Sequence, residues 1–303
     1  MLNKNWLLGV LAASTLSFPP VHAQEVVRLG NLKFAHYGAI SYIKEIASTC
    51  GIKVEEHVFA KGPDVMQAIL AGELDVGATA SEGAISGRAN GAPIYVVAGF
   101  AKGGARLVAR PDSGIKSIKD LKGKRVGVTR GGIHEVLLAA ELGQNGLTMS
   151  DQPGKDVQVV YLAFADLNQA LLGKNLDAIM QSEPQSSQAI NKGFGVEVLK
   201  PYDTPIGEPV RTLVMTEKFY KERRPVAEKY VRETIFKGQI TADDFQNAIA
   251  NSPYSFDVTA AHIQTTTDTM VKYGVGKMTK PPVATDWVRT DLLDQAKKSL
   301  AIK

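Results

Sequence analysis

The sequence predicts an α/β protein built from two similar lobes. Its 303 residues are 44% hydrophobic, which is enough chain for two domains with cores of their own. In each half a strand leads to a basic residue, then to a loop and an apolar helix face; the basic residues are Lys33 and Arg130, 97 positions apart. The segments 68–75 and 170–177 also match, at an offset of 102 positions, and both end in Leu-Asp. A repeat this long indicates two related lobes and not a short-period solenoid.

The first 23 residues predict a secretory signal peptide. Lys4 supplies a positive start, residues 6–16 form a short apolar region, and Ala23 is the small residue typical of a cleavage site. The apolar region is too short to span a bilayer comfortably, and no later run is long enough. We therefore expect cleavage between Ala23 and Gln24 and export of the mature chain, most simply to a periplasm.

The charge balance and the cysteine content exclude several kinds of function. The formal net charge of +4 is too small and too evenly spread to indicate a nucleic-acid partner. Cys50 is the only cysteine, so an internal disulfide and a cysteine-rich metal site are both excluded. The sequence also lacks a nucleophile elbow, a His-Glu-x-x-His motif and a P-loop. We expect a protein that is not an enzyme and has no cofactor and no metal.

The first half of the chain predicts one lobe with a basic loop after its first strand. Residues 26–59 predict strand, loop, helix and strand, with Lys33 in the loop. Glycines and capping residues then delimit the later elements. The predicted elements are strands at 54–59, 74–78, 94–100 and 106–109 and a helix from Asp64 to about Gly72.

A polar loop, 79–84, follows the strand at 74–78 and enters a helix. Ligands of open α/β sheets lie beyond the carboxyl ends of the strands, which is where this loop places Thr79 and Ser81. Both hydroxyls are also suited to capping the helix, and capping and ligand contact are compatible.

The stretch 124–134 is the strongest candidate for a ligand site. A short apolar run predicts a buried strand that ends before Thr129, Gly131-Gly132 predicts a turn, and a helical pattern follows. The first turn of a helix has free N–H groups and a partial positive charge, and Arg130 stands beside it. This combination favours binding of an anion. The alternative is an ordinary strand-to-helix turn with a solvated arginine.

The second half predicts a helix ending near Gly143 and further elements at 157–162, 166–172 and 178–180. The loop 181–184 follows, in the position that Ser81 and Glu82 occupy in the first half. Glu183 in this loop could bind a cationic part of a ligand or pair with Arg130. A carboxylate here also suits a helix N-terminus.

The chain is predicted to cross twice between the lobes. Residues 201–209 contain three prolines and predict a connector, which a strand at 211–215 follows. Helices are predicted at 225–236, 257–273 and 286–300. We expect lobe 1 to comprise 24–108 and 211–303 and lobe 2 to comprise 109–210. Crossings near 105–112 and 205–211 would form a hinge that can close on a ligand.

The segment 118–128, Ile-Lys-Asp-Leu-Lys-Gly-Lys-Arg-Val-Gly-Val, resembles the "DLKGKKVGV" segment of periplasmic solute-binding proteins. The glycine turn, the helix with His134, Asn145-Gly146-Leu147, the repeated Leu-Asp segments and Glu183-Pro184 are similar to the nitrate/sulfonate/taurine branch of these proteins. The resemblance covers the whole mature chain. It implies a two-lobed type II periplasmic binding protein fold, each lobe a mixed sheet flanked by helices, joined by a two-segment hinge. It also implies a monomer that delivers a small molecule to the permease of an ABC-type importer in the inner membrane.

The resemblance further implies that the ligand lies between loops of both lobes. Phe34 and Tyr37 could wall an apolar part of the ligand or belong to the core. His36 and His134 could be ligand-binding, structural or helix-capping. Arg211 lies near the hinge. The implied ligand-binding residues are Lys33, Phe34, His36, Tyr37, Thr79, Ser81, Glu82, Thr129, Arg130, Gly131, Gly132, His134, Glu183 and Arg211.

The leading hypothesis is a binding protein for a small organic anion: an alkanesulfonate, a taurine-like zwitterion or an aromatic carboxylate. It depends on two basic loops at opposed helix N-termini. An alternative in the same class is a binder of thiamine-precursor pyrimidines, which the fold family includes. An enzyme of pyrimidine synthesis is a different class, but the cysteine-rich iron motif of that family is missing. A sensory ligand-binding protein is a third possibility, which an adjacent permease and ATPase gene pair would discriminate from transport.

Overall fold

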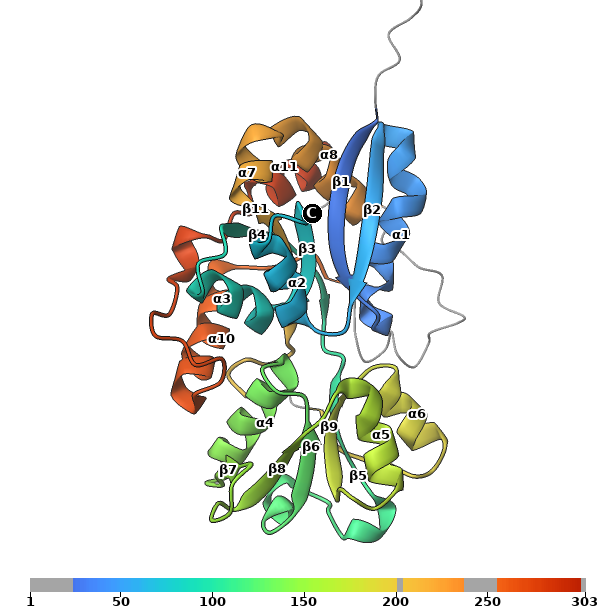
Figure 1. The fold of residues 1–303 in the computed structure, drawn as a ribbon, viewed down its shortest axis with the longest axis vertical. Helices are drawn as coiled ribbons and strands as arrows, with labels where there is room; N and C mark the ends of the chain where they lie inside the picture. Colours follow the sequence, from blue (N-terminus) through green and yellow to red (C-terminus); the bar gives the residue numbers. More distant parts are fainter. Residues whose placement is uncertain (1–23, 201–203, 237–254, 301–303) are drawn as a thin grey trace, which may run out of the picture.

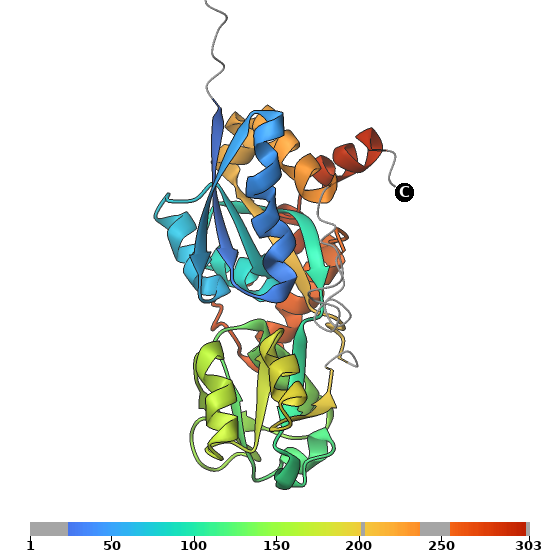
Figure 2. The same cartoon turned by 90° about the vertical axis from the view of Figure 1, so that its right-hand side faces the viewer.

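The structure, a computed structural model, describes residues 24–200, 204–236 and 255–300. The predicted signal peptide and part of the predicted connector, at 201–203, lie outside the described residues. Figures 1 and 2 show two lobes along the long axis, each with a sheet flanked by helices. The predicted fold class is therefore confirmed. Within the described ranges, no helix combines the length and the apolar composition needed to cross a bilayer.

The first lobe is built on a five-stranded mixed sheet of order β2-β1-β3-β11-β4. β1 runs parallel to β2 and β3, whereas β11 runs antiparallel to β3 and β4. Their bounds are β1 Glu25–Leu32, β2 Ile52–Phe59, β3 Val76–Ala80, β4 Ile94–Lys102 and β11 Val210–Thr216. β11 thus confirms the predicted return of the chain to this lobe after the connector.

The helices of the first lobe come from both ends of the chain (Figure 1). The predicted C-terminal helices are confirmed, although the last begins later than expected. A 3-10 turn ends at Asp286, and the fully buried Trp287 follows it. The helical bounds are η1 Ala35–Tyr37, α1 Gly38–Ile46, η2 Ala47–Cys50, α2 Gly62–Leu70, α3 Ser81–Ala89, α7 Glu217–Glu222, α8 Arg224–Phe236, α10 Ala260–Tyr273, η6 Ala284–Asp286 and α11 Asp291–Ser299.

The second lobe has a six-stranded mixed sheet of order β10-β5-β9-β6-β8-β7. Its strands are β5 Ala105–Ala109, β6 Arg125–Val128, β7 Met149–Ser150, β8 Val157–Tyr161, β9 Ala178–Ser182 and β10 Val196–Leu199. Its helices are η3 Pro111–Ser113, η4 Ile118–Leu121, α4 Ile133–Gln144, α5 Phe164–Leu172 and α6 Gln185–Asn191. The stretch 124–134 forms the predicted strand, turn and helix, and Gly131 has a φ of +74°, which only glycine adopts without strain.

The first crossing between the sheets lies earlier than the sequence suggested. β5 pairs with β9 and β10 in the second sheet, so the chain leaves the first sheet at Gly103-Gly104 and not near residue 108. Both glycines have positive φ, of +74° and +79°. The second crossing runs from β10 to β11. The proposed lobe 2 therefore begins at β5.

The lobes also touch away from these crossings. α4 of the second lobe packs against α3 and α10 of the first. At the α10 contact, a Cβ added to Gly143 would lie 2.4 Å from the Tyr273 ring. The two helices therefore approach as closely as the glycine allows.

Candidate functional site

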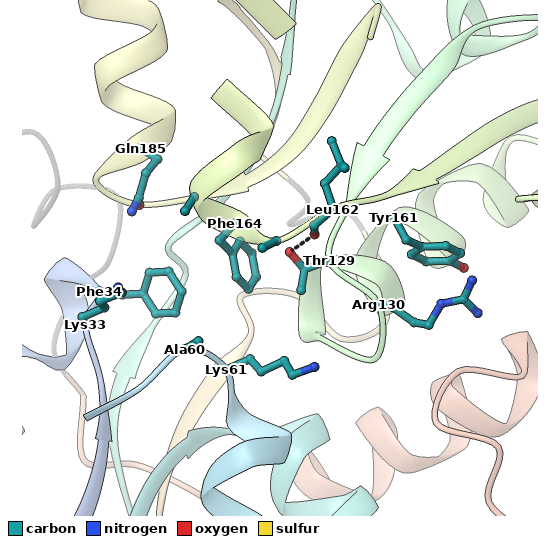
Figure 3. A pocket seen from close by; sticks show the side chains of 12 residues that line it. Lys33, Phe34, Ala60, Lys61, Thr129, Arg130, Tyr161, Leu162, Phe164 and Gln185 are labelled. Carbon is teal, nitrogen blue, oxygen red and sulfur yellow. Dashed lines mark hydrogen bonds between the residues drawn. The ribbon is translucent and has the colours of Figure 1, made fainter. Parts of the chain in front are cut away.

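A pocket of about 460 Å³ opens between the lobes; we call it the outer pocket (Figure 3). Its walls come from the segments that follow β1, β2, β6 and β8 at their carboxyl ends, together with the start of α5 and α6. This is the edge at which open α/β sheets bind ligands. The lining residues are Lys33, Phe34, Ala60, Lys61, Thr129, Arg130, Tyr161, Leu162, Ala163, Phe164, Ala165 and Gln185.

The charge of the outer pocket is of one sign. Lys33, Lys61 and Arg130 line it, and its lining as described includes no aspartate or glutamate. Arg130 is already partly neutralised, because its Nη2 donates to Asp151 at 2.6 Å and its guanidinium lies 3.6 Å from the centre of the Tyr161 ring. Figure 3 shows Arg130 turned toward Tyr161. Lys61 Nζ lies 4.0 Å from an Asp64 carboxylate oxygen, a longer contact than that of Arg130 with Asp151, so the two lysines are the less firmly paired cations.

The predicted turn before α4 is engaged within the protein. The Thr129 hydroxyl donates to the Leu162 carbonyl at 2.9 Å. The Gly131 N–H donates to the Glu135 carboxylate at 2.5 Å, and the Tyr161 hydroxyl donates to the same carboxylate at 2.6 Å. Gly132 is the N-cap residue of α4. Part of the donor capacity that the sequence suggested for a ligand is thus satisfied by Glu135.

Aromatic rings bridge the cleft beneath the outer pocket. Phe34 of the first lobe meets Phe164 of the second edge to face, with ring centroids 5.1 Å apart (Figure 3). His36 stacks on Phe34 at 5.9 Å, and His134 contacts Phe164 at 4.8 Å. Tyr37 packs against His36 and turns into the core of the first lobe. A ligand in the cleft would therefore contact aromatic faces from both lobes.

A small cavity of about 20 Å³, the inner chamber, lies next to the outer pocket and shares Phe34, Lys61 and Phe164 with it. Its polar lining comes from both lobes. Glu82 lies in the first turn of α3 and Arg211 on β11 of the first lobe, and His134 lies in the first turn of α4 of the second. The remaining lining residues are Leu32, His36, Tyr37, Gly62, Ala80, Gly132, Ile133 and Ser182.

The titratable groups of the inner chamber are strongly perturbed. Burial raises the pKa of Glu82 to about 7; the Arg211 guanidinium and backbone N–H groups, including that of Ile133 across the cleft, oppose the rise. Burial and the same guanidinium lower the pKa of His36 and His134 well below the ordinary value, so both imidazoles are neutral. Burial raises the pKa of Tyr37. Perturbed groups gathered in a cleft make it a candidate functional site.

Thr79 and Ser81 lie outside both cavities. The Thr79 hydroxyl sits between two helices, since a Cβ on Gly62 or on Gly83 would lie 2.3 Å from its Oγ1. The predicted capping of α3 by either hydroxyl is wrong, because the N-cap residue is Ala80 and no side chain caps it. Both residues are fully buried in the first lobe.

Glu183 is also turned away from the cavities. Its carboxylate is buried, pairs with Arg106 at 2.9 Å and accepts the Ser187 N–H at 3.1 Å. The suggested pairing with Arg130 is wrong, because Arg130 lies at the far side of the pocket on Asp151. The alternative of a carboxylate at a helix N-terminus is confirmed, since Ser187 lies in the first turn of α6.

Lys61, Tyr161 and Phe164 were not predicted from the sequence. Like Lys33, each lies at or just after the carboxyl end of a strand, Lys61 in the first sheet and the two aromatic residues in the second, so the rule that selected Lys33 could also have found them. Arg211 was selected, and the structure ties it to the first crossing, where its Nη2 donates to the Gly103 carbonyl at 2.7 Å.

A family model of the NMT1-like family matches residues 22–252. The chain belongs to the NMT1-like family. A relative from Escherichia coli (strain K12), which bears the name of an aliphatic sulfonates-binding protein, is 31% identical to this NMT1-like chain over 233 residues. The match covers 74% of the chain and 67% of that relative.

Solved structures show the same fold. The zinc-bound ligand-binding component of an ABC-type import system from Staphylococcus aureus has a TM-score of 0.74 at 19% identity, covering 90% of this chain and 99% of that one. The alkanesulfonate-binding protein SsuA from Xanthomonas axonopodis pv. citri, bound to MOPS, has a TM-score of 0.70 at 16% identity, covering 88% and 98%. This NMT1-like protein therefore has the two-lobed periplasmic binding protein fold.

Proposed function

We propose that this NMT1-like protein is the periplasmic solute-binding component of an ABC importer and that it holds a small organic anion between its lobes. The ligand class rests on the outer pocket, which three cationic side chains line without a carboxylate among its described lining residues. The names of the relatives support the class of protein, since they describe binding proteins and a component of an import system. On the same grounds we propose a role without catalysis.

The walls of the outer pocket support an anion that carries an apolar body. Phe34, Tyr161 and Phe164 supply ring surface, and a volume of about 460 Å³ is within the range of small-molecule sites. A bare inorganic anion would leave most of this surface without a partner. We therefore favour sulfonates and carboxylates with an aromatic or compact apolar body.

Trapping would occur by closure of the lobes. The chain passes between the sheets twice. In the first crossing, Gly103 and Gly104 both have positive φ angles, which glycine adopts without strain. Rotation about these two segments would open the cleft to ligand and close it again. The predicted signal peptide supports a periplasmic location, and the proposed partner is an inner-membrane permease that receives the ligand from a monomer.

A ligand screen tests the proposed function. The mature chain, residues 24–303, is examined by thermal shift and calorimetry with alkanesulfonates, MOPS, taurine, aromatic sulfonates and carboxylates, nitrate and pyrimidines, in a buffer free of sulfonates. A ligand at a hundred times its dissociation constant adds about 2.7 kcal/mol to the folded state. Stabilisation by organic anions is expected; stabilisation by uncharged pyrimidines alone would refute the anion and keep the fold.

A heterocycle is the second candidate, because the same rings that suit an aromatic acid also suit a pyrimidine. The two differ in their dependence on charge. Replacing both Lys33 and Lys61 with alanine should weaken the binding of an anion about tenfold and leave the binding of an uncharged pyrimidine unchanged.

A further inference from the structure

We propose that the first crossing bends at Gly104 when the lobes move relative to each other, and that Arg211 is the positioning residue that confines the bend to Gly104 by holding the Gly103 peptide against the first lobe. This inference rests on the proposed function, for which it names the moving residue and the side chain that directs the motion. It follows from the hydrogen bonds on either side of Gly104 and from the place of Arg211 in the wall of the inner chamber.

The backbone before Gly104 is tied to the first lobe. β4, which ends at Lys102, pairs with β11 up to its last residue. The Gly103 N–H donates to the carbonyl of Pro209, the residue before β11, at 3.1 Å, and Arg211 Nη2 donates to the Gly103 carbonyl at 2.7 Å. Because a peptide unit is planar, a hydrogen bond to its N–H or C=O restrains the whole unit. Both peptide units that flank the Gly103 Cα are therefore held by the same segment, which fixes the torsions of Gly103 within the first lobe.

The backbone after Gly104 is tied to the second lobe. The Gly104 carbonyl accepts the Glu183 N–H at 3.0 Å and the Ser182 hydroxyl at 3.3 Å. Ala105 then pairs with Ser182 in the ladder of β5 and β9. The chain therefore changes lobes across the φ and ψ torsions of a single residue. Gly104 has a φ of +79°, and glycine adopts positive and negative φ about equally readily, so this residue can act as a pivot.

Arg211 connects the pivot to the ligand site. Its side chain is buried, donates to the Gly103 carbonyl and lines the inner chamber beside Glu82. A guanidinium has five N–H donors in a planar fork, so it can hold a backbone carbonyl and still face a cavity. Gly103 also has a positive φ, +74°, and would bend as readily as Gly104 if its carbonyl were released. Arg211 therefore decides that one glycine moves and not two.

Alanine substitutions at the two glycines test the pivot. Because Gly103 and Gly104 have nearly the same φ, alanine at either position is strained and should lower the stability in urea by a similar amount. In Gly104→Ala, rotation of the lobes away from the arrangement of the structure relieves the strain, so the affinity for MOPS, measured by calorimetry, should fall about tenfold. In Gly103→Ala the strain is the same in every arrangement, so the affinity should change less than twofold. Gly114→Ala is the matched control outside the hinge, since Gly114 follows η3 with a φ of +74° and no atom of the described residues lies within 4 Å of an added Cβ.

Spin labels report the arrangement of the lobes without a ligand. Glu45→Cys in α1 and Lys119→Cys in η4, both at exposed positions, carry the labels in a Cys50→Ser background, and pulsed EPR measures the distance between them. The opening ratio is the number of molecules with lobes further apart than in the structure, divided by the number with the lobes as in the structure. Gly104→Ala should raise the opening ratio about tenfold, and Gly103→Ala should leave it unchanged.

A double substitution tests the role of Arg211. Arg211→Met removes the donor and keeps a long side chain. In this background Gly103→Ala should raise the opening ratio at least fivefold, whereas it has no effect in the presence of Arg211. An effect that stays below twofold contradicts the positioning role.

The outcomes separate this inference from the proposed function. Equal responses to Gly103→Ala and Gly104→Ala overturn both the pivot and the role of Arg211, and this comparison holds even if Arg211→Met does not fold. An unchanged opening ratio together with an unchanged affinity in Gly104→Ala also overturns the inference. If neither MOPS nor any other organic anion binds while the label distances respond to Gly104→Ala alone, the proposed ligand is refuted and the pivot stands.

Discussion

The substitution Glu82→Gln should change how the stability of the unliganded protein depends on pH. In the unfolded chain the Glu82 carboxyl has its ordinary pKa of 4.5, and burial in the inner chamber raises the pKa to about 7. Between these values the folded protein keeps a proton that the unfolded chain has released. Stability therefore falls as the pH rises through this window, and the loss is complete above the folded pKa.

The magnitude follows from the shift. One pKa unit corresponds to about 1.4 kcal/mol, so Glu82 contributes a slope of up to about −1.4 kcal/mol per pH unit and a total of about 3 kcal/mol. His36 and His134 contribute the opposite sign, since their lowered pKa makes stability rise with pH through the ordinary histidine range. Both histidines are present in the variant as well, so their contribution cancels in the difference between the two proteins.

Urea unfolding at pH 5, 6, 7 and 8 measures the difference, with Glu141→Gln as the control for a generic buried amide. The free energy of unfolding of Glu82→Gln minus that of the unmodified chain should increase by about 3 kcal/mol from pH 5 to pH 8. Parallel curves for the two proteins would show that Glu82 titrates normally, and the burial argument would then be refuted.

Three further predictions test the site and the lobes. Lys33→Ala and Lys61→Ala should each weaken binding of an organic anion about twofold to fivefold, because both side chains are exposed. Arg130→Ala should change the affinity less than twofold, because Asp151 already neutralises that guanidinium, which is 59% exposed. Calorimetry measures these affinities with Lys119→Ala as a distant control, and a tenfold loss in Arg130→Ala alone would contradict the expectation. Gly143→Ala places a methyl group 2.4 Å from the Tyr273 ring and should oppose the closed form by about 1 kcal/mol, a roughly fivefold loss of affinity. The double variant with Tyr273→Ala should recover that loss, and an unchanged affinity in Gly143→Ala would show that the contact between α4 and α10 does not accompany binding. Glu183→Ala leaves Arg106 paired with Glu197 alone, at 3.1 Å, and should lower the free energy of unfolding by about 3 kcal/mol. The ligand affinity of the folded protein should not change. Urea unfolding measures the stability and calorimetry the affinity, and a lost affinity in a stable variant would place Glu183 in the site.

The strands and helices of this chain could largely be predicted, because their signals are local. The apolar run before Thr129, the Gly131-Gly132 turn and the helix after it follow from periodicity and from the conformational freedom of glycine. The boundary between the lobes could not be placed as well. β5 is a short apolar run that suits either sheet, and only its pairing with β9 and β10 decides which one it joins.

The candidate site shows the same division. Its location at the carboxyl edge of the strands, with Lys33, Phe34 and Arg130 in the loops, was predictable because strand order and loop position follow from the chain. The directions of side chains within those loops were not. Glu183 and Glu82 occupy equivalent loops, yet one pairs with Arg106 beneath α6 and the other lines the inner chamber.

The sequence by itself determined the α/β class, the repeat of strand, basic loop and helix, and the edge at which a ligand would be expected. Tertiary structure alone decided which carboxylate faces the cleft, which cation is already paired, and that Phe34 and Phe164 meet between the lobes. The reason is physical. Periodicity and turn chemistry act over a few neighbouring residues, whereas the burial and pairing of a charge depend on residues far away in the chain, such as Arg211 beside Glu82.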